Sequence, residues 1–261
     1  MDLKSVNDNG PARRRAGDEN VSNVPSNLRR RSIGDHVRLS RRVRREIELR
    51  PLRPGEEMVQ LKRHVRNETQ CEGRIAARCF DARMAFAGND SEALARALNA
   101  VGVLYLESEQ PKDALAFLQD ALKLHRLARN RLGEAVQLAN IGTAHRSMGK
   151  PNKALKHLRQ ALAVAHDAGD RQFEAQVLVI IGSTYAEKRG TCRKALDYLA
   201  AALTQALEAG SADLLDRCRL ELKKCYGVLG KVKFTTACLQ AGVPTHEVDR
   251  LVVDFESGAA R

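Results

Sequence analysis

The residues whose chemistry could support catalysis or metal binding are seven histidines and six cysteines. The cysteines include no CxxC pair, and the histidines form neither an HExxH motif nor a Cys/His set with zinc-ligand spacing. No Ser or Cys lies in a nucleophile-elbow sequence. We therefore expect no metal site, no cofactor and no catalytic residue, and a chain that is not an enzyme.

Gly142 and Gly149-Lys150 partly match the motif of a phosphate-binding loop. Six residues separate the two glycines, whereas a P-loop has four, and Pro151 stands where that loop has Ser or Thr. Both glycines are better explained by an internal repeat, so we do not expect nucleotide binding.

The repeat is visible in the glycines, which recur every 40 residues at Gly102, Gly142 and Gly182. Each has Leu one helical turn before it and a ring side chain three residues after it: Tyr105, His145 and Tyr185. A periodicity of this length indicates an array of stacked supersecondary units.

A second motif, Ala-Leu-x-x-Leu-x-x-Ala-Leu, begins at Ala114, Ala154 and Ala195. Its apolar positions form one stripe of a helix. The third copy arrives one residue late, which predicts an insertion in the turn at residues 189–191. Each unit is thus predicted to be a helix, a tight turn and a second helix. The small residues let the two helices approach closely, and neighbouring units must stack to bury the remaining apolar surface.

These motifs resemble the tetratricopeptide repeat family over three units, residues 95–209. The common repeat has about 34 residues, so the spacing here is similar to the long-repeat branch of kinesin light chain, rapsyn and the Leu-Gly-Asn spindle-orientation adaptors. The resemblance implies an all-α fold, a right-handed superhelical array of antiparallel helix pairs (an α-solenoid). His145 departs from the family's usual Tyr or Phe, and the chain has no Trp.

The resemblance and the composition together predict three regions. Residues 1–54 hold 14 Lys and Arg against 7 Asp and Glu and form a basic, largely disordered arm. Within it we expect a helix over residues 32–50, capped by Ser32, with Val37, Val43 and Ile47 on one face. Residues 55–243 form the repeat domain, with degenerate pairs at 56–87 and 212–242. Residues 244–261 form a capping helix and a tail.

The resemblance also implies a concave groove, lined by the first helix of each unit, that binds peptides. The positions that match are Arg96, Asn99, Val103, Val136, Asn140, Thr143, Arg146, Gln176, Ile180 and Ser183, with Ala139, Val179, Arg217, Leu220 and Lys224 beside them. Asn140 matches an asparagine that in relatives bonds the ligand backbone, and an amide can both donate and accept there. The alternative is a solvated helix face. The other residues of the clamp that holds chaperone C-termini are missing, so we do not expect that ligand.

The arm offers a second set of candidate residues, eight arginines between residues 28 and 45. They are either a solvated stretch or a docking surface for an acidic partner such as tubulin tails, an acidic protein, RNA or the nuclear import machinery. Few aromatics are present to stack on bases, so sequence-specific nucleic-acid recognition is not expected. The arginines are Arg29, Arg30, Arg31, Arg38, Arg41, Arg42, Arg44 and Arg45.

Two functions follow from these features. The first is a non-catalytic scaffold or adaptor that binds a peptide or helix of a protein partner, one with acidic segments, in the groove. The alternative is a structural subunit of a large assembly, such as a ciliary axoneme, a microtubule or a ribonucleoprotein, docked through the arm. The sequence has no apolar run long enough to span a membrane and no secretory signal. We expect a cytoplasmic protein, cytoskeletal or axonemal under the alternative, with a nuclear location left open.

Overall fold

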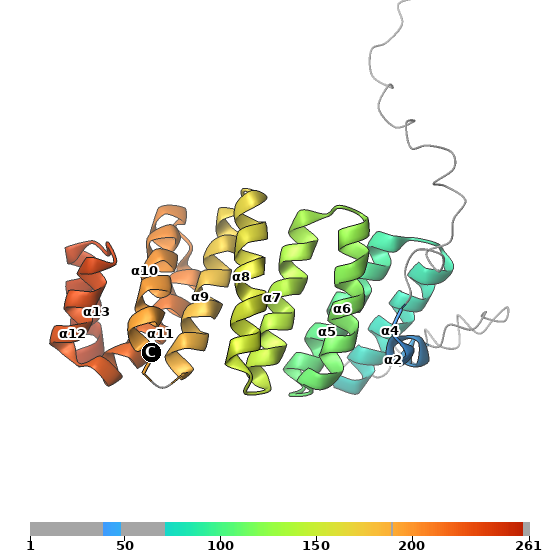
Figure 1. Cartoon of the computed structure of the whole chain (residues 1–261), viewed down its shortest axis with the longest axis horizontal. Coiled ribbons are helices and arrows are strands. Elements are labelled where there is room, and N and C mark those ends of the chain that lie inside the picture. Colours follow the sequence, from blue (N-terminus) through green and yellow to red (C-terminus); the bar gives the residue numbers. More distant parts are fainter. Residues whose placement is uncertain (1–38, 48–70, 189, 258–261) are drawn as a thin grey trace, which may run out of the picture.

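The computed structural model describes residues 39–47, 71–188 and 190–257, and these residues form helices joined by short turns. Successive helix pairs follow one another in a row along the long dimension of the molecule, with the helix axes across it (Figure 1). In chain order they are α2 (Arg41–Glu46), α4 (Cys71–Ala87), α5 (Ser91–Glu107), α6 (Pro111–Leu127), α7 (Arg131–Ser147), α8 (Pro151–Asp167), α9 (Arg171–Glu187), α10 (Cys192–Ala209), α11 (Ala212–Leu229), α12 (Lys231–Gln240) and α13 (Thr245–Glu256).

Four consecutive helix pairs make up most of the row. We call them unit 1 (α5 and α6), unit 2 (α7 and α8), unit 3 (α9 and α10) and unit 4 (α11 and α12). The two helices of a unit contact each other, and each unit contacts the next. The all-α array of helix pairs predicted from the sequence is therefore confirmed.

Local signals in the sequence explain where the helices begin and end. Asp90, Asn130 and Asp170 cap α5, α7 and α9, because their side chains accept hydrogen bonds from backbone N–H groups of the first turn. Pro111 and Pro151 occupy the first positions of α6 and α8, where a missing N–H costs nothing. The turn before α10 is one residue longer than the corresponding turns of units 1 and 2, which is the predicted insertion.

The repeated glycines are the points of closest approach within units 1 to 3. A Cβ atom placed on Gly142 would lie 2.6 Å from Cγ of Leu158 and 3.3 Å from the backbone oxygen of Ala154. Gly102 and Gly182 would meet Leu118 and Leu199 at similar distances. Each glycine of a first helix thus makes room for the central Leu of the second, as the sequence predicts.

A pair of rings lies between the two helices of every unit. In unit 1 the rings of Tyr105 and Phe117 are stacked with centroids 5.5 Å apart, and in unit 3 Tyr185 and Tyr198 are stacked at the same distance. Unit 4 pairs Tyr226 with Phe234 edge to face. Unit 2 differs, because its pair consists of two histidines.

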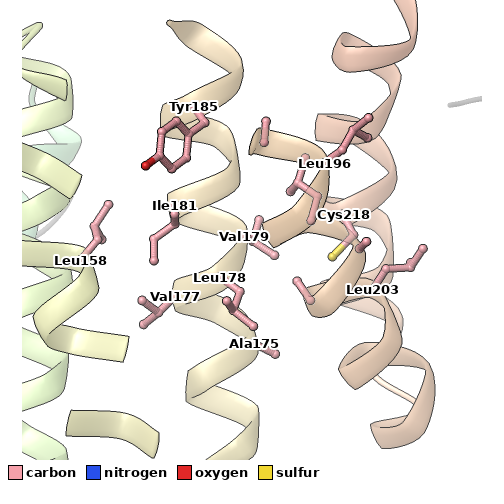
Figure 2. Close-up of a cluster of buried hydrophobic side chains, with 14 of the residues drawn as sticks. Leu158, Ala175, Val177, Leu178, Val179, Ile181, Tyr185, Leu196, Leu203 and Cys218 are labelled. Atoms are coloured by element: carbon pink, nitrogen blue, oxygen red, sulfur yellow. The ribbon is translucent and has the colours of Figure 1, made fainter. Parts of the chain in front are cut away.

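The core runs along the row between the helices, as expected when each unit buries its apolar surface against its neighbours. Helix α9 shows this arrangement (Figure 2). Val177 and Ile181 point toward α8, which carries Leu158, whereas Val179 points toward α10 and α11. All four side chains are buried.

The C-terminal end of the array is covered by α13. Four of its five apolar side chains are buried, as the pattern in the sequence indicates, and they pack with Phe234 of α12. Unit 4 itself is less regular, since α12 has only 10 residues. The buried side chains of α13 are Val248, Leu251, Val252 and Phe255.

At the N-terminal end, α4 takes the place of the second helix of the predicted pair at residues 56–87, and the first helix of that pair falls outside the described residues. The predicted helix over residues 32–50 is described only from residue 39 to 47, and there it is shorter than expected. Its cap is Ser40, whose Oγ accepts a hydrogen bond from the backbone N–H of Val43. Ser32, Val37 and the disorder expected for residues 1–31 lie outside the described residues. The domain boundaries stay a prediction.

Helix α2, which lies within the helix expected over residues 32–50, is folded against the array. Leu39, Val43 and Ile47 are buried in one cluster with side chains of α4, α5 and α6. Val43 belongs to α2 itself, whereas Leu39 precedes its N-cap Ser40 and Ile47 is its C-cap residue. None of the described helices is long and apolar enough to cross a membrane.

Candidate functional site

The face formed by the first helices is the candidate binding surface, and we call it the first-helix face. Consecutive first helices contact one another directly, α5 with α7, α7 with α9 and α9 with α11. Most of the predicted groove residues therefore lie on one continuous surface built from three neighbouring helices. Within the matched set, Arg96 is exposed, and most of the others are half-buried: Asn99, Val103, Val136, Asn140, Thr143, Arg146, Gln176 and Ile180.

The two asparagines of this face contact each other. Nδ2 of Asn140 donates to Oδ1 of Asn99 at 3.0 Å, which links α7 to α5. Both residues are only half-buried, and their one mutual bond leaves donor and acceptor positions on each amide, so the pair still has hydrogen-bonding capacity for an extended peptide. The structure thus brings together two residues that the sequence places 41 positions apart.

Three of the positions proposed for the groove are buried between helices. Ser183 is 5% exposed and its hydroxyl donates to the carbonyl of Val179, one turn earlier in the same helix. Ala139 and Val179 are also buried. A side chain between two packed helices cannot meet a ligand, so we remove these three from the candidate surface.

The cations of the first-helix face have carboxylate partners within the chain. Arg146 lies 3.7 Å from a carboxylate oxygen of Glu187, and Arg96 pairs with Glu92 on the same helix. Lys224, further along on α11, pairs with Glu221 at 2.7 Å. Such exposed pairs contribute little to stability, but they leave the face with less net positive charge than the sequence suggests.

Four of the eight arginines of the predicted docking arm lie in the described residues, all of them on α2 and all exposed: Arg41, Arg42, Arg44 and Arg45. Arg42 contacts Asp113 of α6 at 2.6 Å and Glu46 at 3.0 Å, so it holds α2 to the array. Arg29, Arg30, Arg31 and Arg38 lie outside the described residues.

The ring pair of unit 2 is chemically unlike those of the other units. His145 and His157 are stacked with centroids 5.4 Å apart, and both are half-buried. Nδ1 of each ring is buried, and no group among the described residues bonds to it. Burial lowers the pKa of both histidines. Nearby cations add to this lowering: His157, Lys153 and Lys150 around His145, and Lys156 and Arg126 around His157.

The candidate residues predicted from the sequence did not include the second member of each ring pair or one buried carboxylate, Asp120. A signal for the rings was present, because Phe117, His157 and Tyr198 all directly precede the central Leu of the second motif. The sequence carried no such signal for Asp120, because the matching position of unit 2, Gln160, is not acidic and the carboxylate is therefore not part of the repeat. The Asp120 side chain is almost fully buried and accepts from the backbone N–H of Ser40 at 2.7 Å.

Within the described residues, no group of three or more His, Cys, Asp or Glu side chains could hold a metal ion. The buried cysteines are poor nucleophiles in place. Burial raises the pKa of four of them to about 12, so their thiols stay protonated at neutral pH: Cys79, Cys218, Cys225 and Cys238.

Comparison with known families agrees with the arrangement of helix pairs. Two tetratricopeptide repeat profiles match the chain, one at residues 94–131 and the other at residues 130–209. No curated protein is significantly similar to the sequence. The matched segments coincide with units 1 to 3, where the glycine and leucine contacts recur. Residues 94–209 therefore match tetratricopeptide repeats, a family of protein–protein interaction modules.

Proposed function

We propose that this protein is a non-catalytic adaptor whose first-helix face binds a peptide or helix of a partner protein. The observation that carries the proposal is the continuity of this face across α5, α7 and α9, with the bonded amides of Asn99 and Asn140 near its centre. Half-buried Val103, Val136 and Ile180 supply apolar surface around them. Such a mixture suits an extended segment, because the backbone needs donors and acceptors and the side chains need apolar contact.

The variant Arg146→Glu tests this assignment. Arg146 is half-buried on the face and its ion pair is with the exposed carboxylate of Glu187, so the substitution should leave the fold intact while reversing one charge of the proposed binding surface. Lys233→Glu, on an exposed position of α12, is the matched control. Tagged wild-type protein and both variants are compared by affinity purification and quantitative mass spectrometry. Partners lost from Arg146→Glu and kept by Lys233→Glu support the face. Partners kept equally by both variants show that the face is misassigned.

A second function, docking on a large acidic assembly, is favoured by one observation on α2. Its apolar side is buried in the array, so Arg41, Arg44 and Arg45 are presented to solvent from a fixed helix. Microtubules, with their acidic tails, are the assembly to test. Wild-type protein should co-sediment with them at low salt, and Arg44→Glu with Arg45→Glu should abolish this while sparing the buried contacts. Wild-type protein that stays in the supernatant contradicts this function.

A further inference from the structure

The contact between α2 and unit 1 shows how this array holds a short helix on the side of its second helices. Leu39, Val43 and Ile47 are buried with Phe117 and Leu124 of α6. The chain brings α2 to the end of the row that carries α4, and the helix contacts α6 (Figure 1). The array thus provides an internal example of helix docking that does not involve the first-helix face.

Polar contacts fix α2 at three points. Carboxylates of α6 receive its basic side, since Asp113 pairs with Arg42 and Asp120 accepts from the backbone of Ser40. The third contact involves the ring pair: the hydroxyl of Tyr105 donates to Glu46 at 2.6 Å. A carboxylate from outside the unit therefore completes the hydrogen bonding of the ring pair.

In unit 4, too, a carboxylate from outside the unit bonds to the ring pair, and in unit 3 an arginine from the neighbouring unit does so. The hydroxyl of Tyr226 donates to Glu256 of α13 at 3.1 Å, and Tyr185 is bonded by Arg159 from unit 2. In unit 2, by contrast, the described residues offer no hydrogen-bond partner to either histidine, so its ring pair lacks the outside group that the others have.

The position of that ring pair determines what it presents to a ligand. Nδ1 of His145 and of His157 is buried with no acceptor among the described residues, so a proton there would be a buried and unbonded donor. The neutral tautomer with hydrogen on Nε2 is favoured for both rings. Both residues are only half-buried, and Nε2 of neither ring is among the buried atoms without a partner, so two N–H donors are available to an acceptor.

The residues around the ring pair have the opposite charge character to those of unit 1. One repeat later, Lys153 stands where Asp113 is, and Gln160 stands where Asp120 is. Lys150 and Lys156 are exposed beside them, and α8 has no acidic residue in its first turn. The equivalent surface of unit 2 is also uncovered, since Gln160 is exposed whereas Asp120 is fully buried under α2. We call this surface the histidine face; it consists of His145, Lys153, Lys156, His157 and Gln160.

We propose that the histidine face docks an acidic helix of a partner protein, in the way that unit 1 docks the basic helix α2. Carboxylates of that helix accept from the two imidazole N–H groups and pair with Lys153 and Lys156. Four of its five residues lie on the second helix α8, and His145 of α7 stacks on His157, so the partner can bind at the same time as a ligand of the first-helix face.

The test uses a charge-reversed copy of the chain's own docked helix. The probe is a fluorescent peptide with the sequence of residues 39–47 in which all four arginines are replaced by glutamate; the unchanged basic sequence is the control peptide. Binding to the full chain is measured by fluorescence polarisation. The acidic peptide should bind and the basic peptide should not.

Substitutions then locate the binding. Lys153→Asp with Gln160→Asp recreates the carboxylates of unit 1, so this variant should weaken the acidic peptide about tenfold or more and gain affinity for the basic one. Lys194→Asp changes an exposed lysine at the matching position of unit 3 and should alter binding less than about twofold. Equal loss in both variants, or no binding of the acidic peptide to the wild-type chain, overturns the proposal.

Two other occupants give different outcomes. A carbodiimide, which joins lysines to carboxylates without a spacer, is applied to the full chain with and without the acidic peptide, and the products are mapped by mass spectrometry. Links from Lys153 or Lys156 to the peptide support docking of a partner helix. Links from these lysines to Asp8, Asp18 or Glu19 without peptide assign the face to the chain's own N-terminal residues and overturn the partner proposal. An oligouridine RNA that displaces the peptide and binds as tightly also overturns it.

Discussion

Replacing Gly142 with alanine should destabilise the array, although alanine is the better helix former. The alanine Cβ would lie 2.6 Å from Cγ of Leu158, about 1 Å inside a normal carbon contact. Leu158 is fully buried and the carbonyl of Ala154 stands 3.3 Å from the same point, so the new atom has no free space to enter. Overpacking of this kind costs about 1–3 kcal/mol, against a helix-propensity gain of about 1 kcal/mol.

Gly227→Ala is the matched control, because Gly227 is also helical but has no atom within 4 Å of the added Cβ. That variant receives the propensity gain alone and should be slightly more stable than the parent. The difference between the two variants isolates the overpacking cost, about 1–3 kcal/mol, which corresponds to a Tm difference of about 2–12 °C for a domain of this size. Thermal unfolding followed by circular dichroism measures it.

A double substitution checks the contact itself. Leu158→Ala alone should cost about 2–5 kcal/mol, since it empties a buried site. Combined with Gly142→Ala, the total should be smaller than the sum of the two single effects, because the alanine Cβ then enters the space that Leu158 leaves. Gly142→Ala that is as stable as Gly227→Ala, together with strict additivity in the double variant, would refute the close approach of α7 and α8.

Three further outcomes are expected. Burial lowers the pKa of His145 and His157 below the 6.5 of an unfolded histidine. Between the folded and the unfolded pKa the unfolded chain therefore binds more protons than the folded chain, so Tm should fall as pH drops below about 6.5. Replacing the pair by Tyr and Phe, as in unit 1, should reduce this dependence, and replacing the exposed His246 by Asn should not. Asp120→Ala should cost about 1–3 kcal/mol in urea unfolding and speed hydrogen exchange in residues 39–47, because it leaves the N–H of Ser40 unbonded. A thiol reagent at pH 7.5 should leave four cysteines unmodified in the native protein and label them in urea: Cys79, Cys218, Cys225 and Cys238.

The repeat units could be predicted because their determinants are local. The glycine of a first helix and the leucine it meets lie 16 residues apart in units 1 and 2, and the same spacing of residue types recurs 40 residues later. The packing within one unit depends on residues of that unit, so a regular spacing predicts it even when the contacts of the rest of the chain are unknown. The left-handed residue that ends each unit follows the same logic, although Arg129 takes this conformation in unit 1 where unit 2 has Gly169.

The docking of α2 depends on contacts that sequence periodicity does not report. The apolar face of Val43 and Ile47 was recognisable, but the carboxylates that receive this helix lie 71 and 80 residues away in α6. Asp113 looks like an ordinary first-turn acid, and nothing marks Asp120 as buried. The candidate site was limited in the same way: the first-helix positions came from the family resemblance, whereas burial of Ser183 is decided by how closely α9 packs on its neighbours.

The closure of the two ends has a consequence for how such an array can change its length. Each unit makes its main contacts only with the units before and after it, so unit 2 would present compatible surfaces to a second copy of itself. At the ends the situation differs, because α13 covers unit 4 and α2 is fastened to unit 1 by Arg42 and Glu46. Duplication of a 40-residue segment is therefore accommodated between units 1 and 3, with one more histidine face for each added copy, whereas extension beyond α13 would first have to displace a packed helix.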